Sequence, residues 1–158
     1  MTQGSNELHF FYDAQNKPAV VVYNDIPYSY IKNLQGDIVA ILDSTGTPVV
    51  NYVYDAWGRP ISCSGIMANT LGKINPFRYR GYVYDEETGL YYLRNRFYNA
   101  HNSRCISADS MLSTRGTHTS ANAYAYSRNA PTIRADANGQ DSISVSYTHL
   151  TLPTKLEV

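Results

Sequence analysis

The sequence predicts an all-β protein made of repeated β-hairpins, with one short helix near residues 121–128. Short segments rich in Val, Ile, Tyr and Phe recur along the chain, turn-forming residues separate them, and apolar residues show almost no helical periodicity. The expected strands cover residues 9–12, 19–23, 28–32, 38–42, 49–54, 77–84 and 90–98. Loops of about three to five residues between such strands are typical of hairpins that follow one another in a meander.

The predicted turns resemble one another in sequence. Each offers an Asp or Asn side chain that can accept backbone hydrogen bonds, and most end in a Gly or Asn that tolerates positive φ. Residues 12–18 read YDAQNKP and residues 54–60 read YDAWGRP, an offset of 42 positions (54 − 12). That offset would hold two units of about 20 residues, the short end of known repeat lengths. The residues assigned to the repeat, including a weaker copy at 84–89, are Tyr12, Asp13, Tyr54, Asp55, Gly58, Arg59, Tyr84, Asp85 and Gly89.

Tyrosine is the unusual component of the composition. The chain has 15 tyrosines in 158 residues, against four Phe, one Trp and three Met. Tyrosines at alternate positions, such as Tyr52 and Tyr54, fall on one face of their strand. Tyrosine suits a wall that water wets on one side, because the ring packs while the hydroxyl meets water or a partner. Partly wet rings bury too little surface to stabilise 158 residues alone, so we expect a slice of a longer array and not a self-contained domain.

The pattern divides the chain into four parts. Residues 1–60 carry the repeats, 61–76 read as a loop rich in Gly, Ser, Asn and Thr, and 77–140 hold the second group of strands. Within that third part, the Ala- and Tyr-rich stretch 121–128 is a candidate helix, ended by Asn129 and Pro131. The last part, 141–158, has a different character.

Three stretches carry a resemblance to a known family. Residues 36–37, 52–59 and above all 77–109, which read FRYRGYVYDEETGLYYLRNRFYNAHNSRCISAD, are similar to the RHS/YD-repeat proteins. The third stretch resembles the RHS-associated core, with its pattern R-x-x-G-x-x-x-D-x-x-T-G-L-x-Y-x-x-x-R-x-Y. The resemblance covers roughly residues 8–140, so that residues 77–140 would be the core. It implies a bacterial shell, a spiralling strip of hairpins that encloses a C-terminal toxin of the same polypeptide and is secreted or delivered at the cell surface.

The resemblance also implies a candidate for self-cleavage. The family's core often ends in P-x-x-x-x-D-P-x-G-L, and residues 131–140 keep Pro131, Asp136 and Gly139 but have Ala137 and Gln140 in place of Pro and Leu. Asp109 matches an upstream Asp of the core. Two neighbouring carboxylates can share one proton and activate a water, so Asp109 and Asp136 are the candidate catalytic pair. The alternative is that both are turn residues, as Asp is elsewhere in this chain.

Other function classes find little support. Thirteen basic and 13 acidic residues give a net charge of zero, which excludes a generally basic nucleic-acid binder. Four arginines lie among aromatics at 78–96, where we expect stacking on tyrosine and pairing across the hairpin. No motif indicates an independent enzyme, a cofactor or a metal site, and no apolar run reaches membrane-spanning length. Cys63 and Cys105 are read as incidental free thiols. A carbohydrate-binding, adhesin-like surface remains the alternative to the shell.

The two ends of the chain differ from the repeat pattern. Residues 1–7 lack the basic and apolar regions of a secretory signal. Residues 145–154, VSYTHLTLPT, resemble the translation of a transposase-type sequencing-library adapter. We therefore expect residues from about 144 onward not to belong to the protein, with a genuine β-strand as the alternative.

Overall fold

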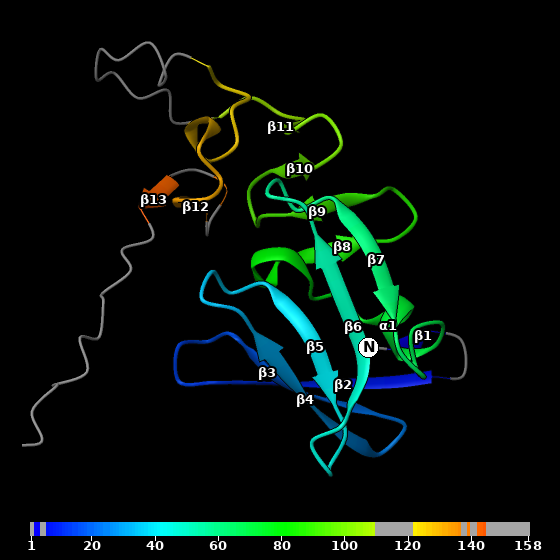
Figure 1. Ribbon diagram of the computed structural model, residues 1–158. Coiled ribbons are helices and arrows are strands. Elements are labelled where there is room, and N and C mark those ends of the chain that lie inside the picture. The colour runs from blue at the N-terminus through cyan, green and yellow to red at the C-terminus, as the bar shows by residue number, and fades with distance from the viewer. Residues whose placement is uncertain (1, 4–5, 110–121, 137–138, 140–141, 145–158) are drawn as a thin grey trace, which may run out of the picture.

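A seven-stranded antiparallel sheet forms the first part of the protein. The computed structural model describes residues 2–3, 6–109, 122–136, 139 and 142–144 (Figure 1). Each strand of this sheet pairs with its neighbours in the sequence, so the sheet is a simple meander. The strands are β1 (Thr2–Gln3), β2 (Asn6–Tyr12), β3 (Pro18–Tyr23), β4 (Ile26–Lys32), β5 (Ile38–Leu42), β6 (Pro48–Tyr54) and β7 (Pro60–Ser64). The predicted all-β fold of successive hairpins is confirmed.

Two smaller sheets follow. The second sheet has the order β11-β10-β9-β8 and is also antiparallel, and a short hairpin pairs β12 with β13. Their strands are β8 (Val83–Asp85), β9 (Leu90–Tyr92), β10 (Phe97–Asn99), β11 (Arg104–Cys105), β12 (Arg134–Asp136) and β13 (Ser142–Ser144). Figure 1 shows the second sheet beyond the end of the large sheet at which β6 finishes. A short helix, α1 (Leu71–Ile74), lies between the two sheets in the sequence.

Four turns of the large sheet share one set of hydrogen bonds. In each, the side-chain oxygen of the first residue accepts hydrogen bonds from the backbone N–H groups two and four positions later. The main-chain carbonyl oxygen of the same residue accepts a hydrogen bond from the backbone N–H three positions later. The residue three positions after the first has positive φ, between 58° and 87°. The four first residues are Asp13, Asn33, Asp43 and Asp55. The sequence likeness of the turns therefore reflects one local geometry, which a short Asp or Asn side chain and a turn-tolerant residue specify.

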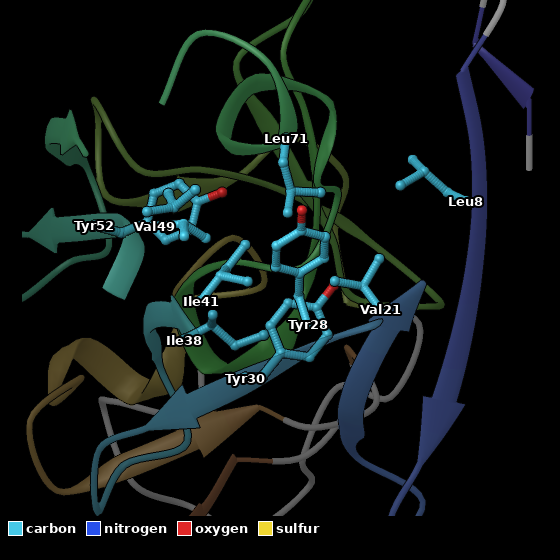
Figure 2. Packing of buried hydrophobic residues seen from close by; sticks show 10 residues of the cluster. Leu8, Val21, Tyr28, Tyr30, Ile38, Ile41, Val49, Tyr52 and Leu71 are labelled. Atoms are coloured by element: carbon cyan, nitrogen blue, oxygen red, sulfur yellow. The ribbon is translucent and has the colours of Figure 1, made fainter. Parts of the chain in front are cut away.

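Each of the first two sheets has its own buried cluster. On β4 the side chains alternate cleanly, with Tyr28 and Tyr30 buried and Ser29 and Ile31 exposed. Figure 2 shows Tyr28, Tyr30 and other members of the first cluster, and Leu71 of α1 closes it. The second cluster consists mainly of tyrosines and is made of Tyr79, Tyr82, Tyr91, Leu93, Tyr98, Ala100, Cys105 and Tyr126.

The expectation that the tyrosines are partly exposed to solvent was wrong for most of them. Of the 14 tyrosines in the described residues, eight are buried: Tyr28, Tyr30, Tyr52, Tyr79, Tyr82, Tyr91, Tyr98 and Tyr126. Burial raises the hydroxyl pKa of Tyr52 to about 12, so this phenol stays protonated and acts as a hydrogen-bond donor. Tyr52, for example, donates to the carbonyl oxygen of Gly72 at 2.7 Å. Five of the buried tyrosines (Tyr52, Tyr79, Tyr82, Tyr91 and Tyr98) donate in this way to backbone carbonyl oxygens.

The predicted helix at 121–128 was wrong over its described residues. Only a 3₁₀ turn forms there (Ser127–Asn129), and all three of its residues have positive φ, which a regular helix cannot contain. The ring of Tyr126 stacks on Tyr98 with centroids 4.0 Å apart, so tertiary packing overrides the helix-favouring composition.

Three strand and loop boundaries also differ from the expectation. The predicted loop 61–76 contains most of β7, which pairs with β6, and all of α1. The predicted strand 77–84 is interrupted by a 3₁₀ turn (Tyr79–Gly81) in which Arg80 has a φ of 56°. The predicted strand 90–98 is two strands, because residues 93–96 form a turn that the Leu93 N–H closes on the Arg96 carbonyl.

Candidate functional site

The turn between β6 and β7 joins the large sheet to the cluster of the second sheet. Three successive carbonyl oxygens of this turn accept hydrogen bonds from tyrosine hydroxyls of the second cluster. The bonds run from Tyr79 to Ala56 at 3.0 Å, from Tyr98 to Trp57 at 2.6 Å and from Tyr91 to Gly58 at 2.7 Å. A Cβ atom at Gly58 would lie 2.4 Å from the Tyr79 ring. Glycine is therefore required here both for its positive φ and for this close approach.

Two buried arginines tie other segments to this junction. Arg78 lies over the rings of Tyr52 and Tyr84, 4.9 and 5.0 Å from their centroids, and pairs with Glu86 at 2.9 Å. The stacking on tyrosine that was expected of the arginines at 78–96 is present in Arg78, and its ion pair reaches the turn after β8. A planar guanidinium can stack and donate at the same time, which a lysine cannot do.

Arg80 makes longer-range connections. Its backbone N–H donates to Asp37 Oδ1 at 2.9 Å, and its guanidinium donates to the carbonyl oxygens of Gln35 and Pro131. Its side chain is only 2% exposed. The guanidinium therefore holds the turn between β4 and β5 against the segment that precedes β12. Sequence reasoning missed this role, since nothing local in RYRG distinguishes a buried arginine from a surface one.

The structure brings the two candidate catalytic aspartates onto one guanidinium. Arg96 Nη2 lies 2.7 Å from Asp136 Oδ2, and Arg96 Nη1 lies 3.3 Å from Asp109 Oδ2. The side chains of Arg96, Asp109 and Asp136 are 5%, 15% and 1% exposed. Arg96 Nη1 also donates to the carbonyl oxygen of Ala123 at 3.1 Å. Three segments that are distant in sequence thus meet at one buried cation, which the sequence alone did not reveal.

Asp136 is the most enclosed member of this group. Its Oδ1 is buried and accepts no hydrogen bond from the described residues, which is uncommon for a charged oxygen in a protein interior. Its main-chain carbonyl accepts from the Tyr82 hydroxyl at 2.8 Å, which fixes the position of β12. Gly139 packs closely as well, because a Cβ there would lie 2.6 Å from the Leu93 carbonyl oxygen. Ala137 and Gln140, the two departures from the cleavage pattern, lie outside the described residues.

The predicted repeat residues lie in three separate turns. Tyr12 and Asp13 open the turn after β2, where Asp13 Oδ2 also pairs with Lys32 at 2.7 Å. In the turn after β6, Arg59 lies 3.4 Å from Asp55. Tyr54 and Gly58 of that turn contact the second cluster. In the turn after β8, Asp85 accepts from the Glu87 N–H at 3.0 Å, Gly89 has a φ of 69°, and the Tyr84 ring lies 4.8 Å from that of Tyr91.

Neither a metal centre nor a membrane span is found in the part of the chain that the structure describes. No group of three or more His, Cys, Asp or Glu side chains there could hold a metal ion. No helix among those residues is both long and apolar enough to cross a bilayer. Both cysteines are free, and burial raises the pKa of the Cys105 thiol to about 11.

Comparison with known proteins decides the family. The sequence model described as the teneurin YD-shell matches residues 2–132. The chain belongs to the teneurin YD-shell family. The match of this YD-shell chain confirms the resemblance to RHS/YD-repeat proteins that residues 77–109 indicated.

Curated relatives of the YD-shell chain include nucleases and toxins. The tRNA nuclease WapA of Bacillus subtilis strain 168 is 46% identical over 112 residues, which are 71% of this chain and 5% of that protein. The toxin protein Tse5 of Pseudomonas aeruginosa is 42% identical over 64 residues, which are 40% of this chain and 5% of that protein. The YD-shell chain thus spans about a twentieth of the length of these relatives.

Solved structures share the fold. The TcdB2–TccC3–Cdc42 crystal structure matches 85% of this chain and 6% of its own chain, with a TM-score of 0.73 and 25% identity. The Tc holotoxin pore of Photorhabdus luminescens matches 86% of this chain and 6% of its own, with a TM-score of 0.68 and 24% identity. The YD-shell chain thus has the fold of one part of these much larger assemblies.

Proposed function

We propose that this YD-shell chain is part of the wall of a bacterial shell that encloses a C-terminal toxin and helps to deliver it. The observation that carries the proposal is the superposition of 85% of the chain on the TcdB2–TccC3–Cdc42 structure. The names of two relatives, a tRNA nuclease and a toxin protein, support a toxic cargo on the same polypeptide. The wall's partners would then be the remaining shell repeats and that cargo, outside the cell that makes them.

The packing of the tyrosines supports a wall over a carbohydrate-binding surface. A wall needs a continuous interior, whereas a binding surface needs separate exposed aromatic grooves. Aromatic contacts run without a break from Tyr52 through Tyr54, Tyr79 and Tyr91 to Tyr98, with centroids 5.9–6.2 Å apart. Rings packed in this way rigidify the junction between the sheets and are not free to stack on a sugar.

Protection of the cargo tests the proposal. The complete polypeptide that carries this sequence would be treated with a non-specific protease, and the lifetime of its C-terminal region compared with that of the same region expressed alone. We expect the enclosed region to survive at least tenfold longer. Gly58→Val should shorten that lifetime, because it drives the β6–β7 turn away from Tyr79, whereas Gly46→Val, where a Cβ meets no atom within 4 Å, should have a smaller effect. Equal lifetimes of the enclosed and free regions would exclude a shell.

Self-cleavage between shell and cargo is a second candidate function, favoured by the meeting of Asp109 and Asp136 at Arg96. In such a reaction one carboxylate takes a proton from water as the water oxygen attacks the peptide carbonyl. The other carboxyl, protonated, gives its proton to the leaving amine as the C–N bond breaks, which yields a new carboxylate and a new amine. Arg96 would hold both side chains in position.

Gel electrophoresis of the complete polypeptide tests self-cleavage. Wild type should run as two bands, and Asp136→Asn and Asp109→Asn as one. Asp85→Asn, in an exposed turn, serves as the matched control and should remain cleaved. An uncut wild type, or a cleaved Asp136→Asn variant, would leave the two aspartates with a structural role only.

A further inference from the structure

A cavity of about 780 Å³ lies where the turns of the large sheet meet the second sheet. One side is formed by the turn between β2 and β3 and by the turn between β4 and β5. The other side is formed by residues 80–83, the turn after β9, and Ala135 of β12. Its lining residues do not include Asp109 or Asp136, the pair assigned to self-cleavage.

The charges around this cavity are all of one sign. Lys17, Lys32, Arg80 and Arg94 line it, and no Asp or Glu is among its lining residues. Lys32 already pairs with Asp13, and Arg80 pairs with Asp37 at 3.7 Å and donates to backbone carbonyls. Within the described residues, Lys17 and Arg94 are exposed and have no ion-pair partner. Asp13 and Asp37 offset the charges of Lys32 and Arg80, so the cavity presents two available cations, Lys17 and Arg94, with no carboxylate among its lining residues.

The remaining lining is mainly aromatic and aliphatic. Tyr12 and Tyr92 are 52% and 43% exposed, and the ring of Phe77 lies 6.2 Å from that of Tyr12, centroid to centroid. Val83, which is 37% exposed, adds aliphatic surface. Exposed rings beside available cations form a site for a ligand that carries both apolar groups and negative charge.

We propose that this cavity binds an acidic peptide segment, with carboxylates at Lys17 and Arg94 and apolar side chains against Tyr12, Phe77 and Tyr92. An extended peptide alternates its side chains, so it can supply both kinds of group within a few residues. A sugar acid would leave many of its hydroxyls against apolar lining without partners, at a cost in free energy. A single nucleic-acid strand needs cations that follow its backbone, and this chain has no surplus of basic residues.

The test uses the complete polypeptide and a defined probe. A fluorescein-labelled ten-residue peptide of alternating Glu and Leu is titrated by fluorescence anisotropy, together with a peptide in which every Glu is Gln. We expect the Glu peptide alone to bind, and its affinity to fall with added salt. The double variant Lys17→Gln, Arg94→Asn should weaken binding roughly tenfold, because two exposed ion pairs are lost. Asn is chosen at position 94 because it tolerates the φ of 68° found there.

A matched double variant distinguishes local from general charge effects. Lys73→Gln, Arg128→Asn removes the same charges from exposed positions outside the cavity, and Arg128 also has positive φ, at 52°. We expect it to bind the Glu peptide as wild type does. The proposal is overturned if the Gln peptide binds equally well, if both double variants weaken binding alike, or if no binding is seen at millimolar peptide. Stronger binding of oligogalacturonate or of a single-stranded oligonucleotide at the same residues would assign the cavity to that ligand instead.

Discussion

The hydroxyl of Tyr98 donates a 2.6 Å hydrogen bond to the carbonyl oxygen of Trp57, which lies 41 residues earlier in the chain. Tyr79 and Tyr91 make equivalent bonds to the carbonyl oxygens on either side of it. Phenylalanine could fill the same space but could not donate a hydrogen bond to these acceptors. The high tyrosine content of the chain thus has a structural cause at this turn.

Replacing Tyr98 by Phe tests the value of that hydrogen bond. We expect Tyr98→Phe to lower the free energy of unfolding by about 1–2 kcal/mol, because the Trp57 carbonyl loses its donor while the ring packing is kept. Urea unfolding followed by tyrosine fluorescence measures the change. Tyr92→Phe, at a ring that is 43% exposed, is the control and should change the free energy of unfolding by less than about 0.5 kcal/mol.

Substitutions at the two turn glycines Gly58 and Gly46 can distinguish the effect of backbone strain from the effect of a steric clash. Their φ values are 85° and 82°, so an alanine at either position carries a similar strain of about 1–2 kcal/mol. Only at Gly58 does the new methyl group also meet a ring, 2.4 Å from Tyr79. Gly58→Ala should therefore be the more destabilising of the two, by at least about 1 kcal/mol. Equal losses in urea unfolding would mean that the β6–β7 turn can move without cost.

Acid should weaken the fold through its turn aspartates. Hydrogen bonds from the side chains of Lys32, Thr45 and Thr88 lower the pKa values of Asp13, Asp43 and Asp85, respectively. A carboxyl whose pKa is lower in the folded state stabilises the fold above its unfolded pKa of about 4, and this contribution is lost as the pH falls through the folded pKa. Stability should decline from pH 5 towards pH 2.

The variant Asp43→Asn isolates one of these contributions. Asparagine keeps an oxygen that can accept the turn's backbone hydrogen bonds but does not titrate. We expect the melting temperature of the variant to fall less between pH 5 and pH 2 than that of wild type, with little difference between the two proteins at low pH. A fall as steep as that of wild type would mean that Asp43 does not contribute to acid sensitivity.

The two thiols should differ in reactivity. Cys63 is exposed, whereas Cys105 is 3% exposed and burial raises its pKa to about 11. Iodoacetamide at pH 8 should alkylate Cys63 first in the folded protein, since only the accessible thiolate reacts. Peptide mass spectrometry gives the order of labelling. Both cysteines should react at similar rates in urea, and preferential labelling of Cys105 in the folded protein would contradict the burial found here.

Local signals explain why the hairpins between residues 6 and 54 could be predicted. The turns at Asp13, Asp43 and Asp55 are specified by residues within five positions of one another, and strand alternation is also a local pattern. Sequence reasoning therefore located these strands to within a few residues. It also selected Asp109 and Asp136, although only as matches to a family pattern.

Contacts between distant residues explain the failures. The predicted strand 77–84 is broken at Arg80, whose backbone N–H bonds Asp37, 43 positions away. The predicted helix near 121–128 yields to the stacking of Tyr126 on Tyr98. Arg96 was counted among arginines that stack on tyrosine, but its main contacts are two carboxylates. None of these contacts is indicated by the sequence near the residue concerned.

The β6–β7 turn also implies an order of folding during synthesis. Its three carbonyl oxygens receive donors that follow them in the chain by 23, 33 and 41 residues. A ribosome adding about 5–20 residues per second would complete the hairpin seconds before the last of these donors leaves the exit tunnel. Until then the carbonyl oxygens of the turn face water, and each tyrosine that emerges can donate a hydrogen bond to one of them. We expect the large sheet to form first and to serve as the template on which the second sheet assembles.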